Sequence, residues 1–230
     1  MRRTVFALFL TLLLLSGCTG GVTPEPPMIA PDTPIVDPAP DTPDEPSAEE
    51  ALDARLRERV AAMTLEEKVG QLFFVRCPET NTAEEIRAYH LGGVLLFGRD
   101  FKNADGAWLA VEEIKATLAS YQNAAELPLF IGSDEEGGTV TRVSRDPNFR
   151  TVPYPSPQEL YADGGMASIR SDAANKAITL RDLGINVNLA PVCDVSADPA
   201  DFIYPRAFGQ NAESTAEYVR TVVEEYVFQD

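Results

Sequence analysis

The chain has 230 residues, of which 36 are acidic and 19 are Lys or Arg, so its formal charge at pH 7 is −17. Clustered Lys and Arg drive binding to DNA and RNA, so this charge argues against a nucleic-acid partner. Three cysteines are too few for a disulfide framework, and one histidine cannot form a metal site of several imidazoles. The 44% of hydrophobic residues predicts one globular domain in most of the chain.

Residues 1–17 have the layout of an export signal. Two arginines precede an apolar run over residues 5–15, which is too short to span a bilayer as a permanent helix. The LSGC sequence of residues 15–18 resembles the lipobox of bacterial lipoproteins. This resemblance implies cleavage before Cys18, diacylation of its sulfur, and anchoring of the mature chain to membrane lipid outside the cytoplasm. A plain secretory signal is the alternative.

Residues 18–50 have the composition of a spacer. Between Thr19 and Glu50 there are nine prolines and eight acidic residues, with no basic residue. Repeated proline prevents helix formation and removes hydrogen-bond donors from a sheet, while like charges repel each other. We expect an extended, disordered linker here. The remaining residues, 51–230, are long enough to bury a sizeable core.

Helical and strand patterns alternate in residues 51–230. A serine or threonine followed three residues later by glutamate predicts a helix start when a helical pattern follows. Such pairs are Ser47 with Glu50, Thr64 with Glu67, Thr82 with Glu85 and Ser156 with Glu159. In chain order, we predict helices over 51–62 and 65–72, a strand over 71–75, a helix over 82–89, a strand over 92–97, a helix over 105–125, a strand over 127–132, a short helix from Ser156, a helix over 167–183, a strand over 185–191 and a helix over 212–228.

This alternation predicts an α/β fold with a parallel sheet and right-handed crossovers, either a doubly wound sheet or a barrel. No Gly-x-Gly-x-x-Gly or Walker loop follows the strands, which argues against nucleotide binding. Polar residues follow the strand ends instead: Arg76 and Glu79, Arg99 and Asp100, Asp134 to Glu136, and Asp194 and Asp198. In (β/α)₈ barrels, active sites lie on that face.

Four motifs follow one another along the chain: LGGVLLFG at 91–98, DEEGGTVTR (Asp134–Arg142), NLAPVCDV at 188–195 and YPRAFG at 204–209. The second is similar to the D-(Q/E)-E-G-G-x-V-x-R segment of glycoside hydrolase family 3, in its bacterial β-N-acetylhexosaminidase branch. The other three resemble motifs of the same family. The β-glucosidase branch usually has His-Gly after this aspartate, so Glu-Gly-Gly favours the hexosaminidase branch. The resemblance implies a (β/α)₈ TIM barrel, of which about the first four βα units are present.

The resemblance also implies a function. Enzymes of this branch remove terminal β-linked N-acetylglucosamine from peptidoglycan or chitin fragments by a retaining mechanism without metal or cofactor. The sugar-binding residues of the family correspond to Asp134, Arg142 and Arg206. A carboxylate at a strand tip can accept hydrogen bonds from two sugar hydroxyls, and guanidinium groups suit hydroxyl, amide or carboxylate oxygens. The alternative is that Asp134 and Arg142 merely pair with each other to organise the turn.

The family's catalytic residues have no counterpart in these 230 residues. The family continues with a Lys-His-Phe-Pro-Gly-His-Gly motif, an acid/base histidine and a nucleophilic aspartate, and none of these is present. We therefore expect an inactive fragment or truncated product of such an enzyme. A non-catalytic, surface-tethered carbohydrate-binding lipoprotein is the alternative, and a solute-binding protein of a transporter is a weaker one.

Several other residues have structural interpretations. We expect His90 to lie on the side opposite the cleft, and Glu135 and Glu136 to hold the turn through backbone N–H groups or Arg142. Cys77 and Cys193 follow strands that lie apart in a barrel, so two buried thiols are favoured over a disulfide.

Overall fold

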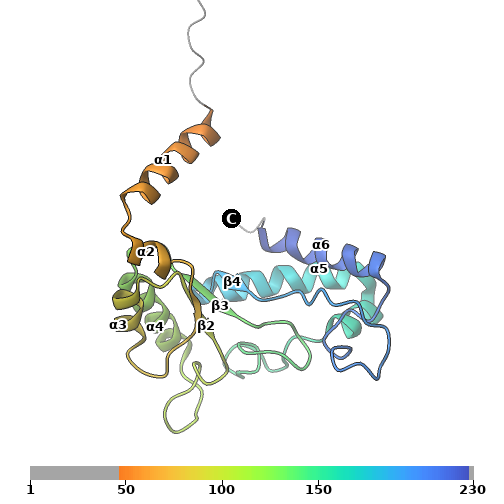
Figure 1. Cartoon of the computed structure of the whole chain (residues 1–230). Coiled ribbons are helices and arrows are strands. Elements are labelled where there is room, and N and C mark those ends of the chain that lie inside the picture. Colours follow the sequence, from red (N-terminus) through yellow and green to blue (C-terminus); the bar gives the residue numbers. More distant parts are fainter. Residues whose placement is uncertain (1–46, 228–230) are drawn as a thin grey trace, which may run out of the picture. The chain divides into compact units, whose positions relative to one another are not determined.

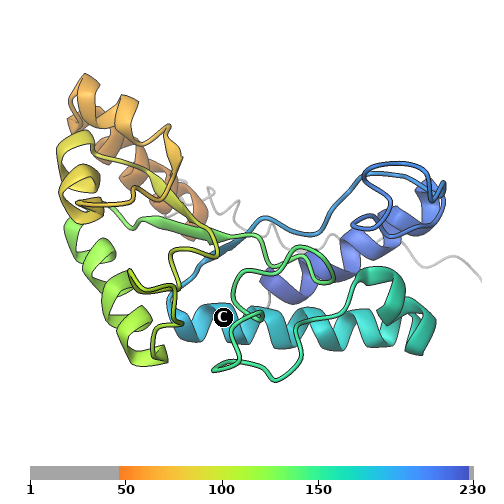
Figure 2. The same ribbon diagram turned by 90° about the horizontal axis from the view of Figure 1, so that it is seen from below.

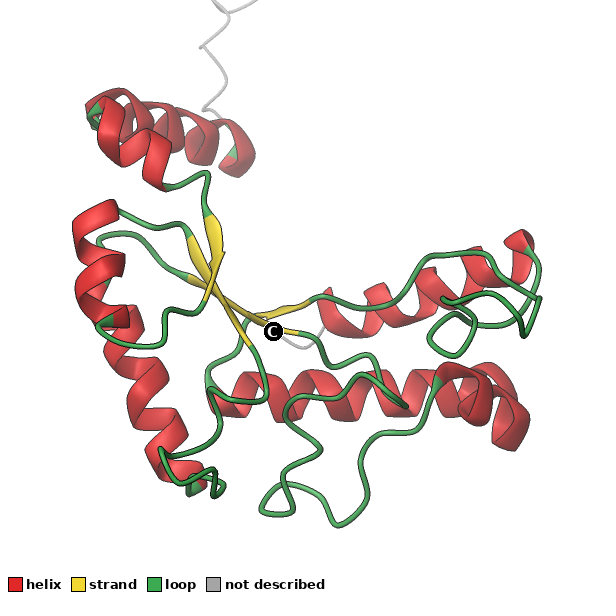
Figure 3. Ribbon diagram, turned by 60° about the horizontal axis from the view of Figure 1, so that its bottom comes forward, coloured by secondary structure: helices red, strands yellow, loops and turns green. Residues whose placement is uncertain are grey.

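The computed structural model describes residues 47–227, so the predicted signal, Cys18 and nearly all of the linker lie outside the described residues. Its strands are β1 (Phe74–Arg76), β2 (Gly93–Leu96), β3 (Phe130–Ser133) and β4 (Val187–Asn188). They form one parallel sheet in the order β1-β2-β3-β4, at the centre of Figure 3. In a (β/α) barrel, each new parallel strand is added beside the previous one, as it is here. In a doubly wound sheet, the order of strands reverses at a switch point. The predicted α/β class is confirmed.

The helices alternate with these strands after an initial pair. They are α1 (Ala48–Ala62), α2 (Leu65–Gly70), α3 (Thr82–Tyr89), α4 (Val111–Ala124), α5 (Pro157–Leu183) and α6 (Ala212–Val227). In Figure 1, α5 and α6 run side by side. Over residues 47–227, no helix combines the length and the apolar character that crossing a bilayer requires.

Two predicted helix starts are confirmed in detail. The Thr64 hydroxyl accepts from the amide of Glu67, whose carboxylate accepts from the Thr64 amide at 2.6 Å. Ser156 and Glu159 form the same capping box at the start of α5. The two helices predicted between residues 156 and 183 are joined across a kink at Gly164 and Gly165, where the backbone angles are not helical.

The helices predicted from residues 82 and 212 begin at Thr82 and Ala212, as expected, but one other start and the capping of α3 differ from the prediction. The helix predicted from residue 105 begins only at Val111, because the Asn103 side chain accepts from the amides of Asp105 and Ala107 and Gly106 adopts a φ of 80°. These bonds close a turn in place of the first helical turn. Thr82 does not cap α3, because its hydroxyl donates to the carbonyl of Pro78 at 3.2 Å.

The strands are shorter than predicted, or shifted along the chain. The prediction of β1 over residues 71–75 was wrong at its start, because the amides of Leu72 and Phe73 bond back to Val69 and Gly70 in a turn. The third strand, predicted over 127–132, begins at Phe130, and the fourth, predicted over 185–191, pairs only at residues 187–188. An apolar run marks a buried segment but does not define its hydrogen bonds.

The core lies between the sheet and the helices on its outer face. Val75, Val94 and Ile131 are aligned across the strands and point to this side. They pack with α3, α4 and α5, whose buried members include Ile86, Ile114, Leu118, Leu180 and Leu183. In Figure 2, α3 and α4 lie along the same side of the strands. A second cluster joins α5 to α6, where the ring of Phe208 stacks on Tyr218 at 4.7 Å.

On the opposite face of the sheet, two glycines leave space for an aromatic ring. Phe74, Gly93 and Phe130 are aligned across the first three strands, and Phe74 and Phe130 are 39% and 60% exposed. A Cβ on Gly93 would lie 2.3 Å from Cδ2 of Phe74, and one on Gly132 would lie 2.4 Å from Cζ of the same ring. The two glycines therefore make room for Phe74 on the face that forms the interior of a barrel.

We predict that Gly93→Ala destabilises the fold because the added methyl group clashes with Phe74 and with the Phe130 carbonyl oxygen. The free energy of unfolding, measured by urea denaturation, should fall by about 1–3 kcal/mol, which is typical of overpacking. Gly98→Ala is the matched control, because nothing lies within 4 Å of its Cβ position. Equal losses in both variants would contradict the close approach.

Candidate functional site

The candidate site begins where β3 ends, at the segment Asp134–Gly138. Asn188 of β4 holds this segment, because its side chain accepts from the Glu135 amide at 2.9 Å and donates to the Glu135 carbonyl oxygen at 3.2 Å. The Asn188 amide group also donates to the Tyr226 hydroxyl at 2.6 Å. One asparagine thus links the tip of β3, the neighbouring strand and α6.

The carboxylate of Glu135 is fully buried and fixes the return of the chain. Its Oε2 atom accepts from the amides of Arg142, Val143 and Ser144 at 2.9, 2.7 and 3.3 Å, and Oε1 accepts from the Ser144 hydroxyl. A buried charge is tolerated when hydrogen-bond donors surround it. The prediction that Glu135 holds the turn through backbone N–H groups is confirmed.

Two glycines allow the turn to close. Gly137 and Gly138 have φ angles of 99° and 61°, which side-chain-bearing residues rarely adopt. Gly137 also forms a bridge with Val140, and a Cβ on it would lie 2.2 Å from the carbonyl oxygen of Pro155. The Glu-Gly-Gly sequence therefore turns the chain back so that Arg142 returns to Asp134.

Asp134 and Arg142 meet at the carboxyl ends of the strands. Nη2 of Arg142 lies 3.3 Å from Oδ2 of Asp134, and the two side chains remain 26% and 18% exposed, respectively. The guanidinium groups of Arg142 and Arg76 lie over the ring of Phe97, at 5.5 and 4.8 Å from its centre. The pairing proposed as the structural alternative does occur, and it leaves part of each group accessible to solvent.

Arg206 pairs with a different carboxylate. Its Nε and Nη2 atoms donate to the two oxygens of Glu136 at 2.9 and 2.7 Å, while Glu136 is buried and Arg206 is about one-third exposed. Hydrogen bonding to Glu136 is the main cause that raises the pKa of Arg206, and the charges of Asp134 and Asp194 raise it further. The expectation that Glu136 holds the turn through N–H groups or Arg142 was therefore wrong.

A buried lysine supports this pair from α5. The Lys176 ammonium group lies 2.7 Å from the carboxylate of Asp172 and donates to the Glu136 carbonyl oxygen at 3.1 Å. Neither Lys176 nor the Glu136–Arg206 pair was predicted from the sequence. The partners are 40 and 70 residues apart, and no local pattern marks them. Asn188, also missed, opens the NLAPVCDV motif, which was the available signal.

Two further predictions can be compared with the structure. Cys77 and Cys193 are both free thiols, but Cys193 is exposed, so the expectation of two buried thiols was wrong for Cys193. Burial is the main cause that raises the pKa of Cys77, and the charge of Asp100 adds to it. His90 ends α3 just before β2, at the end of the strands away from Asp134, as expected.

The comparisons with known proteins identify the family. Residues 64–226 match the model of the glycosyl hydrolase family 3 N-terminal domain, so the chain belongs to this family. It is 30% identical over 223 residues to beta-hexosaminidase LpqI of Mycobacterium tuberculosis, covering 94% of this chain and 52% of the relative. It is 31% identical over 137 residues to beta-hexosaminidase A of Pseudoalteromonas piscicida, covering 56% of this chain and 21% of that protein.

Solved structures agree with this assignment. LpqI of M. tuberculosis superposes with a TM-score of 0.61 at 25% identity, covering 74% of this chain and 47% of that one. A family 3 beta-N-acetylglucosaminidase of Paenibacillus superposes with a TM-score of 0.61 at 29% identity, covering 72% and 31%. The chain therefore spans about half of LpqI and less of the other relatives. The described strands and helices are part of a TIM barrel of this family.

We predict that Glu135→Gln lowers the free energy of unfolding by about 3–5 kcal/mol, because the new NH2 group must face either the N–H groups of residues 142–144 or the Ser144 hydroxyl, all of which donate to the carboxylate. Glu112→Gln is the matched control, since Glu112 is 84% exposed in an ion pair with Lys115 and should change stability by less than about 1 kcal/mol. Urea denaturation of both variants measures the difference. Similar stabilities would contradict the role of Glu135.

Proposed function

We propose that this protein acts on terminal β-linked N-acetylglucosamine of peptidoglycan or chitin fragments, and that Asp134, Arg142 and Arg206 bind the sugar. Two ion pairs near the carboxyl ends of the strands, Asp134 with Arg142 and Glu136 with Arg206, support the proposal. Both lie within the region that matches a glycosidase family. The names of the curated relatives, which are beta-hexosaminidases, favour this substrate class.

The free hydrogen-bonding capacity of the three residues suits a sugar. Asp134 meets Arg142 through Oδ2, so its Oδ1 atom can accept from sugar hydroxyls. Arg206 uses Nε and Nη2 on Glu136, which leaves Nη1 as a donor in a fixed direction. The Asp134 carboxylate, which contacts Arg142 and whose charge acts on Arg206, can thus accept from hydroxyls while the two arginines donate to hydroxyl or acetamido oxygens. Pairing to Asp134 and Glu136 holds the arginines in place before the sugar binds.

Retaining hydrolysis also needs a nucleophile and a proton donor on opposite sides of the glycosidic bond. The only histidine, His90, lies at the other end of the strands from Asp134. We therefore propose that hydrolysis requires groups from outside these 230 residues and that this chain alone binds sugar without turnover. The same observation favours the second candidate, a non-catalytic carbohydrate-binding protein tethered to the cell surface.

The proposed organisation places the protein outside the cytoplasm. It comprises a lipoprotein signal at 1–17, a lipidated Cys18 with a linker to residue 50, and the family 3 domain from residue 51. The LSGC sequence and the nine prolines that follow it support this arrangement. Two acyl chains on Cys18 would hold the protein durably at a bacterial membrane, whereas one chain gives only reversible binding.

We predict that N-acetylglucosamine binds the full chain and that Asp134→Asn weakens binding about 10- to 100-fold, because a charged hydrogen bond contributes about 1.5–3 kcal/mol. Saturation-transfer NMR titration measures both affinities. Asp105→Asn is the matched control, because Asp105 is exposed and its carboxylate makes no hydrogen bond or ion pair among the described residues.

A chromogenic β-N-acetylglucosaminide separates binding from catalysis. We expect no turnover by the chain alone. Turnover would refute the need for outside groups, while unchanged affinity in a folded Asp134→Asn protein would refute the assignment of the sugar site. The circular dichroism spectrum of each variant shows whether it is folded.

A further inference from the structure

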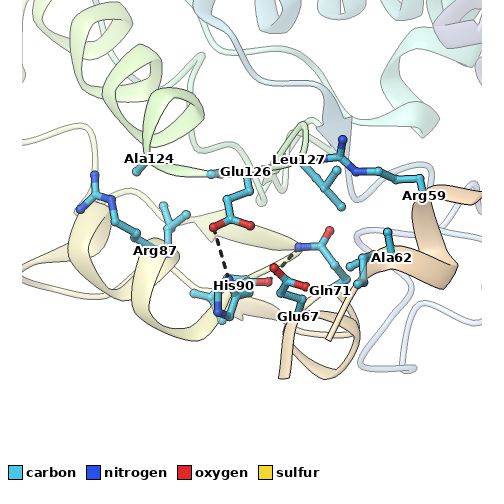
Figure 4. Close-up of a pocket in the computed structure, with 13 residues that line it drawn as sticks. Arg59, Ala62, Glu67, Gln71, Arg87, His90, Ala124, Glu126 and Leu127 are labelled. Carbon is cyan, nitrogen blue, oxygen red and sulfur yellow. Dashed lines mark hydrogen bonds and ion pairs between the residues drawn. The ribbon is translucent and has the colours of Figure 1, made fainter. Parts of the chain in front are cut away.

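The end of the sheet opposite the sugar site has a cavity of about 250 Å³ with a group of metal-ligand atoms in its wall (Figure 4). Glu67 of α2, His90 at the end of α3, and Glu126 in the loop between α4 and β3 each offer one ligand atom. These atoms all lie within 4.8 Å of one another. The three residues come from three separate elements, so a ligand bound among them would join those elements.

We propose that Glu67, His90 and Glu126 form a zinc-binding site. An imidazole nitrogen with two carboxylate oxygens is a ligand set that suits Zn²⁺, whereas Mg²⁺ and Ca²⁺ prefer oxygen ligands alone. Three protein ligands leave one position of a tetrahedral site for water, and the cavity has room for it. The two carboxylates also balance the charge of the cation.

Two of the ligands are already held in place. The Glu67 carboxylate accepts from the Thr64 amide through Oε2, which directs the side chain and leaves Oε1 free for a metal ion. The backbone of His90 is fixed because its N–H donates to the Ile86 carbonyl and its own carbonyl oxygen accepts from the Gln71 side chain at 2.8 Å. Orientation of ligands by neighbouring hydrogen bonds is usual in metal sites.

The third ligand completes the group and can move. Nδ1 of His90 lies 4.0 Å from Oε1 of Glu126, too far for a hydrogen bond, and Glu126 is 61% exposed. In the described part of the chain, neither imidazole nitrogen of His90 makes a hydrogen bond, and the charged group of Glu67 lies close to the ring. Ligand atoms about 2.0–2.2 Å from a tetrahedral zinc ion lie about 3.4 Å from one another, so rotation of the Glu126 side chain must shorten the distance from its Oε1 to Nδ1 of His90 by about 0.5 Å.

The charges around the group favour a cation at its centre. In Figure 4, the carboxylates of Glu67 and Glu126 point toward His90, while the guanidinium group of Arg87 points away from the group. Two ionised carboxylates at this distance repel each other, and a cation between them removes that repulsion. The sequence did not reveal the group, because its members are separated by 23 and 36 residues.

The test uses the full chain, purified without a polyhistidine tag and titrated with zinc chloride by isothermal calorimetry. We expect one Zn²⁺ per chain, with affinity at least about tenfold weaker in Glu126→Gln and in His90→Asn. Asparagine tolerates the left-handed backbone of residue 90, whose φ is 50°. Glu66→Gln and Cys193→Ser are the matched controls, because Glu66 is an exposed neighbour on α2 and Cys193 is an exposed thiol that could bind zinc by itself.

A second measurement depends on there being only one histidine in the chain. All imidazole NMR signals therefore come from His90, and one equivalent of zinc should shift them in the parent protein and in both controls. Zinc binding that is unchanged in Glu126→Gln and His90→Asn, or that is lost in Cys193→Ser, would overturn the proposal. Unshifted imidazole signals at saturation would show an adventitious ion only, which overturns it as well.

Discussion

The buried carboxylate of Glu135 is the interaction on which the candidate site depends. It gathers the amides of residues 142–144 and the Ser144 hydroxyl around one charge, so the chain after β3 must turn back over the strand tip. Removing a partner from a buried charge is expensive, which makes this arrangement rigid. The pairing of Arg142 with Asp134 is a consequence of the turn, because Arg142 donates its own amide to Glu135.

The sugar-binding proposal uses two arginines that are held by different means. Arg142 is close in sequence to its carboxylate and belongs to the same turn, whereas Arg206 arrives on the long connection between β4 and α6 and is held by Glu136. Glu136 is in turn fixed through its carbonyl oxygen by Lys176 of α5. Each acid of the DEEGG sequence therefore has a different partner: Asp134 pairs with Arg142, Glu135 accepts from the N–H groups of the turn, and Glu136 pairs with Arg206.

The sequence predicted the class of fold because the alternation of apolar runs with capped helices reflects local rules. The capping boxes at Thr64 and Ser156 were confirmed for this reason. Predictions failed where local alternatives compete, as when the Asn103 side chain closes a turn in place of the first turn of α4. The ion pair of Lys176 with Asp172 has the four-residue spacing of a helix, so it is a local contact. The pair of Glu136 with Arg206 joins residues that are 70 positions apart and meet only in the folded protein.

The two ion pairs of the candidate site close chain segments of very different length. The contact of Asp134 with Arg142 closes a loop of eight residues, and that of Glu136 with Arg206 closes one of 70. On a simple polymer estimate, closing the longer loop costs about 2 kcal/mol more in chain entropy. The turn alone therefore brings Asp134 to Arg142, whereas Glu136 and Arg206 are brought together by the packing of α5 and β4, which lie between them in the chain.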